Sequence, residues 1–293
     1  MERRLLYMVC CLLLLMWSGA EAHALTYTRQ DSLRVVELLR DGARQPKSSN
    51  LMLYYGHRLL DVPYVGKTLE VNPVEELVVN LRELDCTTFV ETVLALTLTT
   101  RGGGQKWDDY CQTLTRIRYR NGQMKGYVSR NHYFSQWIVS NVGLGLVSER
   151  KATPAGNYFP FTAKQRIDVH YMSQHPDLYP MLSGKQEDID RIRRYEEKIN
   201  GTTVRYIPSR LLNRDRKTLR YVQDGDILAL VTSRDGLDIS HVGIAEWGTD
   251  GKLHLLNASS IHKKVVLDSI SLYDYMMKYD HRLGIRVLEP QNP

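Results

Sequence analysis

Three short apolar segments, separated by turn residues, constrain the fold of this chain most strongly. Each has the length of one strand and is bounded by glycine and polar residues. The short connections between them favour pairing of neighbouring segments side by side. The sequence therefore predicts an antiparallel sheet built from residues 226–232, 241–247 and 252–258.

The connection between the second and third segments sets their register. Residues 248–251 read Gly-Thr-Asp-Gly, which predicts a type I turn with Gly251 in the left-handed conformation and a bulged hairpin. In that register Asn257 lies opposite Gly243 and diagonal to His241 on the same face of the sheet. A slip of one residue would put the two side chains on opposite faces. The hairpin thus brings His241 and Asn257 together, provided that this register forms.

A helix is predicted to begin at Cys86. Asp85 is a favourable N-cap residue, apolar residues follow at helical spacing, and the pattern ends at Arg101 before three glycines. Cys86 then lies in the first turn, where free N–H groups and the helix dipole favour a thiolate. A cysteine in this position is not by itself an active-site residue, because catalysis also needs a base within reach.

Two of the four cysteines, Cys10 and Cys11, lie in a predicted leader, so Cys86 and Cys111 remain. One disulfide between them is the simplest arrangement for an exported protein. However, the apolar residues that follow Trp107 recur at helical spacing and include Cys111. We therefore expect Cys111 to be a free, buried thiol on the apolar face of a helix.

The N-terminus has the pattern of a secretory signal peptide. Two arginines precede an apolar run at 5–17, and an Ala-Glu-Ala sequence ends at Ala22. The run is shorter than the roughly 20 residues that span a bilayer, and no later segment is apolar enough to do so. We expect a signal peptide at 1–22, and one exported catalytic domain at 23–293 that works as a monomer.

Composition places the chain among ordinary globular proteins. Hydrophobic residues make up 43% and charged residues 25% of the chain, and the formal net charge is +6. This charge permits an anionic partner but does not demand a nucleic acid, and none is expected. The sequence has no His-Glu-x-x-His motif, so we expect neither a metal nor another cofactor.

Cys86, His241 and Asn257 together suggest nucleophilic catalysis on an amide. The histidine would take the thiol proton and return it to the leaving amine, while the asparagine carbonyl would orient the imidazole. The backbone N–H of Cys86, at the start of its helix, would stabilise the oxyanion.

Five motifs, in the same order along the chain, resemble those of the NlpC-type cell-wall cysteine hydrolases, a papain-like superfamily. The most specific is Leu-Asp-Cys-Thr-Thr-Phe-Val-Glu at 84–91, which resembles the nucleophile motif Asp-Cys-x-x-Phe. The others are a Pro-Tyr-x-x-Gly-like segment, a Gly-Asp-Ile strand start, a His-Val-Gly-Ile strand and the third catalytic position. They lie at 62–66, 225–227, 240–244 and 257–259. The resemblance implies an α+β domain in which the nucleophile helix packs on an antiparallel sheet behind N-terminal helices.

One branch of this superfamily is especially similar, the N-acetylmuramoyl-L-alanine amidase-like proteins of Gram-negative gut bacteria. It shares an Arg-x-His-Tyr-Phe-x-x-Trp segment, here at 130–137. The resemblance implies a peptidoglycan or muropeptide substrate, the periplasm of a Gram-negative bacterium, and catalysis by Cys86, His241 and Asn257. The residues expected to bind substrate are Tyr64, Asp85, Thr87, Arg130, His132, Tyr133, Trp137 and Ser240. For Arg130, His132, Tyr133 and Trp137, packing in a half-buried amphipathic helix is an equally good interpretation.

The sequence departs from the superfamily pattern at three places. Asn257 replaces a histidine, and Thr87-Thr88 replaces Ser-Gly beside the nucleophile. Residues 145–213 have no counterpart in minimal members, and 186–199 within them predict a charged helix. We interpret 145–213 as an insertion that forms a wall of the substrate groove, although a solvated insertion is physically equivalent.

Three alternatives to the amidase stay open. The nearest is an endopeptidase that cleaves the D-glutamyl–diaminopimelate bond, as most of the superfamily does. A protein that binds cell wall without catalysis could have kept the fold. Acyl transfer to an acceptor other than water is the third.

Overall fold

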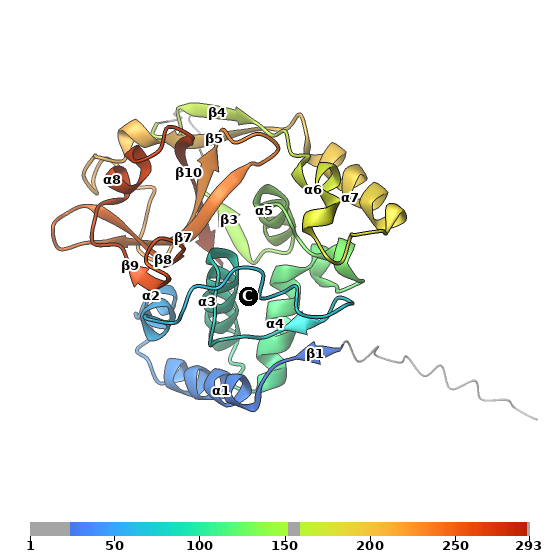
Figure 1. Ribbon diagram of the computed structural model, residues 1–293. Coiled ribbons are helices and arrows are strands. Elements are labelled where there is room, and N and C mark those ends of the chain that lie inside the picture. Colours follow the sequence, from blue (N-terminus) through green and yellow to red (C-terminus); the bar gives the residue numbers. More distant parts are fainter. Residues whose placement is uncertain (1–23, 152–158, 292–293) are drawn as a thin grey trace, which may run out of the picture.

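The computed structural model describes residues 24–151 and 159–291, so the predicted signal peptide at 1–22 lies outside the described residues. Its centre is an eight-stranded sheet with the order β4-β5-β10-β6-β7-β8-β9, in which β3 also pairs with β10 (Figure 1). All of its pairings are antiparallel. The strands are β3 (Val147–Glu149), β4 (Ala163–Arg166), β5 (Thr203–Pro208), β6 (Ile227–Thr232), β7 (Ile239–Trp247), β8 (Leu253–Ser259), β9 (Lys264–Leu267) and β10 (Arg282–Pro290).

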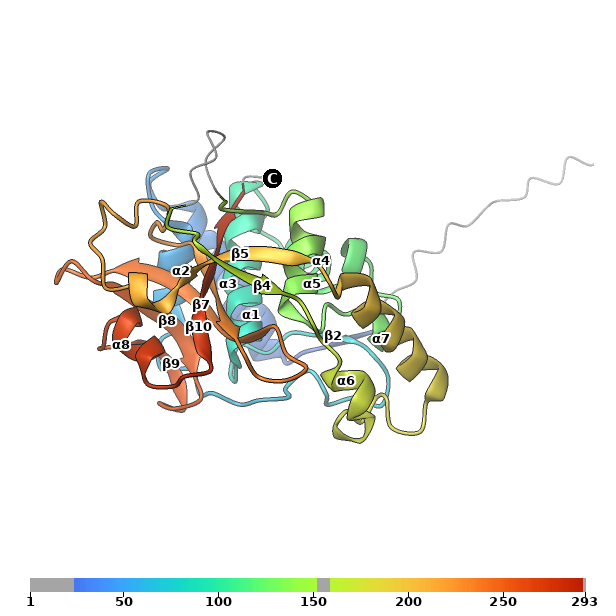
Figure 2. The ribbon, with the colours of Figure 1, turned by 90° about the horizontal axis from the view of Figure 1, so that it is seen from above.

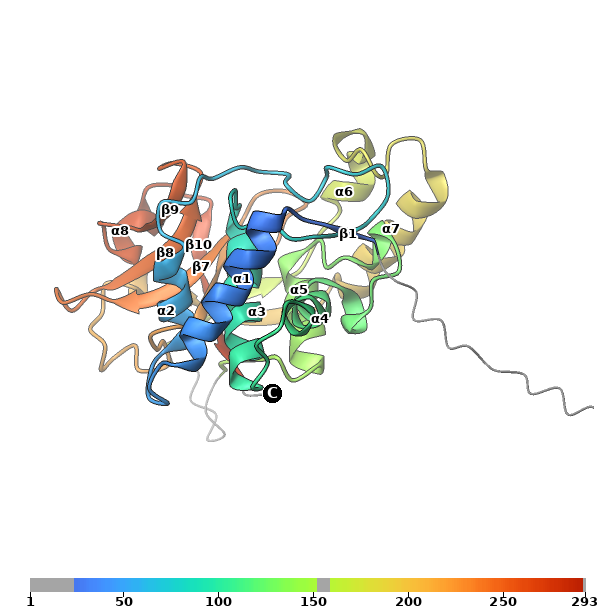
Figure 3. The same cartoon turned by 90° about the horizontal axis from the view of Figure 1, so that it is seen from below.

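The helices cover both faces of this sheet unequally. The large apolar core joins helices α1 to α5 to one face, and a smaller core joins α8 to the other. Figure 2 shows α8 apart from the helices of the large core. Figure 3 shows α1 and α3 together on the side of the sheet that carries this core. The helices are α1 (Arg29–Ala43), α2 (Leu51–Arg58), α3 (Cys86–Arg101), α4 (Trp107–Arg118), α5 (Phe134–Gly143), α6 (Tyr171–Gln174), α7 (Gln186–Ile199) and α8 (Leu272–Met277). A short parallel pair, β1 (Leu25–Thr26) and β2 (Leu77–Val78), lies apart from the main sheet. Among the described residues, no helix is both long enough and apolar enough to cross a bilayer.

The hairpin of β7 and β8 has the predicted register. Ile244 pairs with Leu256, which places Asn257 opposite Gly243. Gly251 has a φ of 75°, and its turn is closed by a hydrogen bond of 2.8 Å from the N–H of Gly248 to the carbonyl of Lys252. The three predicted strands are confirmed, and the turn residues fix the register that the site requires.

Helix α3 begins at Cys86 as predicted, because Asp85 and Thr88 cap it reciprocally. The Asp85 carboxylate accepts from the N–H of Thr88 at 2.8 Å, and the Thr88 hydroxyl accepts from the N–H of Asp85 at 2.9 Å. The helix then runs through the apolar core, packed against β7 and β8, and ends before the glycines that start at Gly102. Its first turn is thereby fixed against the hairpin.

The two remaining cysteines are free thiols. Cys111 lies in α4 and packs against the large core, so the prediction of a free thiol on an apolar helix face is confirmed.

Residues 145–213 contribute strands to the main sheet as well as surface structure. Within this segment, β3 and β5 pair with β10, and β4 extends the edge through β5. The predicted charged helix at 186–199 is confirmed as α7. Residues 152–158 of the segment lie outside the described residues. The description as an inserted groove wall is thus incomplete, because much of the segment belongs to the sheet.

Candidate active site

The start of α3, strand β7 and the segment before α3 meet at Cys86. Cys86 is half-buried, and the backbone N–H of Val242 in β7 lies close enough to its sulfur to favour the thiolate. Tyr64 is held nearby by a parallel bridge with Leu84, and burial, followed by the charges of Cys86 and Asp85, raises the pKa of Tyr64 to about 12. The sulfur is therefore next to the strand that carries His241.

His241 and Asn257 are hydrogen-bonded, with 2.9 Å between His241 Nε2 and Asn257 Oδ1. The orientation of the Asn257 amide follows from its other contacts. Its Nδ2 donates to the Leu255 carbonyl at 3.1 Å and to the Asp268 carboxylate at 2.8 Å. Because Oδ1 can only accept, His241 carries its proton on Nε2, and Nδ1 stays available as a base.

Asp268 is a buried carboxylate that the sequence did not reveal as part of the site. Besides Asn257, it contacts the half-exposed ring of His262, with 3.1 Å between Asp268 Oδ1 and His262 Nε2. The side chain is 3% exposed. In the sequence, Asp268 is marked only by its position just after the strand 264–267. Aspartate is common at such positions, and no motif includes this one. His262, too, gave no signal beyond a polar context.

Tyr275 and Arg282 are two more neighbours that the sequence did not indicate. The rings of Tyr275 and His241 have centroids 6.2 Å apart. The Arg282 guanidinium lies over the Tyr275 ring, with Cζ 4.0 Å from its centroid. Both residues come from the C-terminal segment, and neither lies in one of the five motifs.

The environment keeps both reactive groups neutral. Burial, reinforced by the charge of Asp85, raises the pKa of Cys86 to about 12, against the weaker effects of the Val242 N–H and of Thr87. Burial also lowers the pKa of His241, against the hydrogen bond that His241 donates to Asn257, which raises it. Desolvation and the charge of Asp85 thus act against the thiolate that the helix start was expected to favour. A neutral thiol beside a neutral imidazole requires transfer of the proton during the reaction.

The start of α3 also offers a donor for an oxyanion. Among the described residues, no acceptor contacts the backbone N–H of Cys86, and the first backbone bond of the helix runs from Phe89 to Asp85. A free N–H beside the nucleophile is the arrangement that stabilises a tetrahedral intermediate.

Half of the residues predicted to bind substrate lie around Cys86. Asp85 and Thr87 flank it in sequence, Tyr64 lies beside it, and Ser240 precedes His241 with its hydroxyl 3.4 Å from the Leu230 carbonyl. Asp85 is engaged in capping α3. The other three are half-buried and adjacent to the reactive groups.

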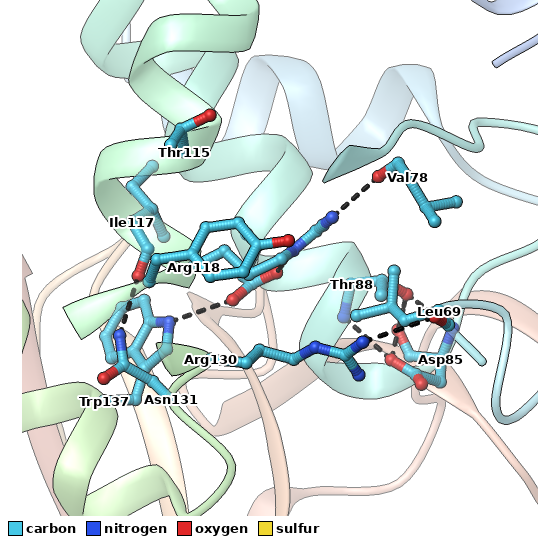
Figure 4. Close-up of polar contacts among 12 residues, drawn as sticks. Leu69, Val78, Asp85, Thr88, Thr115, Ile117, Arg118, Arg130, Asn131 and Trp137 are labelled. Carbon is cyan, nitrogen blue, oxygen red and sulfur yellow. Dashed lines mark hydrogen bonds and ion pairs between the residues drawn. The ribbon is translucent and has the colours of Figure 1, made fainter. Parts of the chain in front are cut away.

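The remaining four candidates have internal partners, and Figure 4 shows two of them, Trp137 and Arg130, the latter with its bond to the Leu69 carbonyl. Arg130 is buried and pairs with Glu70 and Glu75 at 2.5 Å each. Trp137 is fully buried and donates to Glu91 at 3.2 Å. The hydroxyl of Tyr133 donates to Glu196 at 2.7 Å, and His132 contacts the Tyr127 carbonyl at 2.9 Å. These contacts favour a structural role over the substrate-binding role predicted from the sequence.

In 24–151 and 159–291, no group of three or more His, Cys, Asp and Glu side chains is placed to hold a metal ion.

Residues 54–285 match the family of AmiA-like, N-acetylmuramoyl-L-alanine amidase-like proteins. The structure is similar to the crystal structure of an N-acetylmuramoyl-L-alanine amidase from Bacteroides uniformis, with a TM-score of 0.76 and 37% identity over 86% of this chain and 100% of that chain. It is also similar to a Bacteroides fragilis protein that carries a provisional xylanase name, with a TM-score of 0.74 and 40% identity over 81% of this chain and 99% of that chain.

A Legionella pneumophila protein shares the fold at 21% identity, with a TM-score of 0.66 over 90% of this chain and 96% of that chain. No curated protein matches this chain. Because the family match covers most of the sequence, the chain belongs to the AmiA-like, N-acetylmuramoyl-L-alanine amidase-like family.

Proposed function

We propose that this protein is an exported peptidoglycan hydrolase that cleaves the amide between N-acetylmuramic acid and L-alanine, with Cys86, His241 and Asn257 as a papain-like, NlpC-type triad. The observation that carries the proposal is the hydrogen bond of 2.9 Å between His241 and Asn257, formed beside a cysteine at a helix start. The similarity to a B. uniformis amidase supports the choice of bond. The signal-peptide pattern supports export, and a Gram-negative periplasm is where such a substrate is reached.

The reaction follows from the protonation states. His241 Nδ1 takes the proton of Cys86 Sγ as the sulfur attacks the lactyl carbonyl, and the Cys86 N–H holds the oxyanion. The imidazolium, stabilised through Asn257, returns the proton to the L-alanine nitrogen, and the peptide leaves. Water, deprotonated by His241, then hydrolyses the thioester, which releases the N-acetylmuramic acid carboxylate, and the proton that His241 took restores the thiol of Cys86.

A digest of defined muropeptides, read by mass spectrometry, tests the bond that is cleaved. Release of intact tripeptide or tetrapeptide with a free L-alanine amine is the expected result. Sugar that retains L-Ala-D-Glu would instead identify the D-glutamyl–diaminopimelate endopeptidase. The variant Cys86→Ala should abolish release, and Cys111→Ala, which removes the other thiol, should keep it.

Two further outcomes would overturn the proposal. Wall binding that is equal in wild type and Cys86→Ala, without release of any peptide, would indicate a binding protein. A product in which the muramoyl group is joined to an added amine rather than to water would indicate acyl transfer.

Fractionation of cells that express the full chain tests the location, for which recovery of a shortened protein in the periplasm is expected.

A further inference from the structure

Arg282 is held rigidly at the edge of the site. It is the first residue of β10, beside a register shift between Arg282 and Gly284 that interrupts regular pairing. Its guanidinium lies over the rings of Tyr275 and Tyr279, with Cζ 4.0 Å and 4.4 Å from their centroids. One of its nitrogens also donates to the Tyr275 carbonyl. A guanidinium clamped in this way loses little further freedom when it binds a ligand.

The positive charge of Arg282 is not neutralised by the protein. Among the described residues, no carboxylate lies within ion-pair distance of its guanidinium, although Arg118 and Arg286 each have one and Arg130 has two. The side chain is half-buried, and Tyr279, on one side of it, is 46% exposed. An unpaired, partly desolvated cation is costly unless something else supplies the anion.

The unpaired charge of Arg282 also makes His241 a weaker base. Among charged neighbours, Arg282 has the largest effect on His241, and it lowers the pKa of the imidazole that must accept the proton from Cys86. An anion bound to Arg282 would cancel this effect when substrate is present. Arg282 thus lowers the basicity of His241 in the empty site, and a bound anion would restore that basicity.

We infer that Arg282 binds the α-carboxylate of the D-glutamate in the stem peptide, and so determines specificity for a non-amidated substrate. The inference rests on the proposed function. The D-glutamate directly follows L-alanine, and because it is linked through its γ-carboxyl, its α-carboxylate is free. Consecutive Cα atoms are about 3.8 Å apart, so this carboxylate lies one residue beyond the reacting nitrogen. On the protein side, one ring separates the base from the cation: the centroids of His241 and Tyr275 are 6.2 Å apart, and Arg282 Cζ lies 4.0 Å from the Tyr275 centroid.

A pair of muropeptides that differ in one group tests this role. The substrates are MurNAc-tripeptides whose D-glutamate α-carboxylate is either free or converted to the carboxamide. Wild type should hydrolyse the free acid with a kcat/KM on the order of 10- to 100-fold above that for the amide, since a charge-assisted hydrogen bond is lost with the latter. Arg282→Gln should lower kcat/KM for the acid relative to that for the amide by the same factor, so that the preference for the acid disappears, and Arg282→Lys should be intermediate.

The matched control is Arg234→Gln, which removes one exposed positive charge near the same end of the sheet. It should retain the preference for the free acid. An equal loss on both substrates in Arg282→Gln would show that Arg282 only supports the fold, and a wild type that does not distinguish the substrates would overturn the inference.

Binding separates this inference from the proposed function. In the Cys86→Ala background, calorimetry with the same two muropeptides should show tighter binding of the acid, and Arg282→Gln should remove the difference. If wild type hydrolyses neither compound, the proposed reaction fails while the binding difference still decides the role of Arg282.

Discussion

The carboxylate of Asp268 accepts a hydrogen bond of 2.8 Å from the side-chain amide of Asn257, and this bond decides which end of the amide faces His241. An asparagine amide can be turned by 180° at little steric cost, so the hydrogen-bond network must choose its orientation. Because Asp268 only accepts, it takes the Nδ2 end and leaves Oδ1 for the imidazole. Asp268 is in this sense a positioning residue that acts through Asn257.

Asp268→Asn should therefore lower kcat/KM by about tenfold or more, since the new amide can present a donor and turn Asn257 around. Its pH profile should change as well. The charge of Asp268 raises the pKa of His241, so its removal should move the acid limb to lower pH. His262→Gln, which keeps the contact between Asp268 and Asn257, serves as the control. If Asp268→Asn lowers the maximal kcat/KM but leaves the acid limb of the pH profile at the wild-type pH, Asp268 acts only on the fold.

The neutral resting pair predicts the pH dependence of the wild-type enzyme. The pKa of His241 is lowered from 6.5 and that of Cys86 is raised to about 12. His241 is a neutral imidazole above its pKa, and Cys86 stays a thiol well into alkaline solution because its pKa is high. The kcat/KM should thus rise along an acid limb below pH 6.5 and then stay level to about pH 9. A preformed thiolate–imidazolium pair would instead lose activity as the imidazolium deprotonates, and a bell centred near neutral pH would contradict our assignment.

Alkylation by iodoacetamide reports on the role of His241 as base. Burial raises the pKa of Cys111 to about 12 as well, so neither cysteine is intrinsically activated. The Cys86 sulfur lies against the backbone N–H of Val242, the residue that follows His241 in β7, and with His241 as its base it should react at least about tenfold faster than Cys111 at pH 7. The His241→Ala variant should abolish the difference, as followed by mass spectrometry of the labelled peptides. Equal rates in wild type would remove the evidence for a base at Cys86.

Local chemistry explains why much of the fold could be predicted from the sequence. The Gly251 turn and the Asp85 cap act through nearest neighbours, so the register of β7 with β8 and the start of α3 follow from a few residues. Those two elements place Cys86, His241 and Asn257.

Other parts of the site depend on tertiary contacts that leave no local signal. Asp268 reaches Asn257 because β9 pairs with β8, and Arg282 reaches Tyr275 because β10 returns to the sheet beside α8. The buried partners of Arg130 come from a segment some 60 residues earlier in the chain. The desolvation that raises the pKa of Cys86 has no local signal either, because it is a property of the packed protein.

His132 should make the folded protein sensitive to acid. Burial, together with the charge of Arg130, lowers its pKa from 6.5 to about 3. Between pH 6.5 and pH 3, His132 is therefore protonated in the unfolded chain and neutral in the folded chain. The free energy of unfolding falls as the pH is lowered through this range. The loss is on the order of 1 kcal/mol per pH unit in that window.

His132→Gln, which can still donate to the Tyr127 carbonyl, should flatten this dependence. The measurement is the midpoint of urea unfolding for both proteins between pH 4 and pH 7.5. Parallel curves for wild type and variant would show that other groups account for the acid sensitivity.

Gly243 should be indispensable because the hairpin leaves no room for a side chain. A Cβ at this position would lie 2.9 Å from the Leu256 carbonyl oxygen and 3.0 Å from the Asn257 Cβ. Gly243→Ala should cost about 1–3 kcal/mol of stability and displace Asn257 from His241, so that activity falls further than stability does. At Gly143 a Cβ would meet nothing within 4 Å, so Gly143→Ala at the end of α5 should leave both properties near wild type. Thermal unfolding and muropeptide hydrolysis measure the two effects separately, and a fully active Gly243→Ala would show that the contact between His241 and Asn257 tolerates movement of β8.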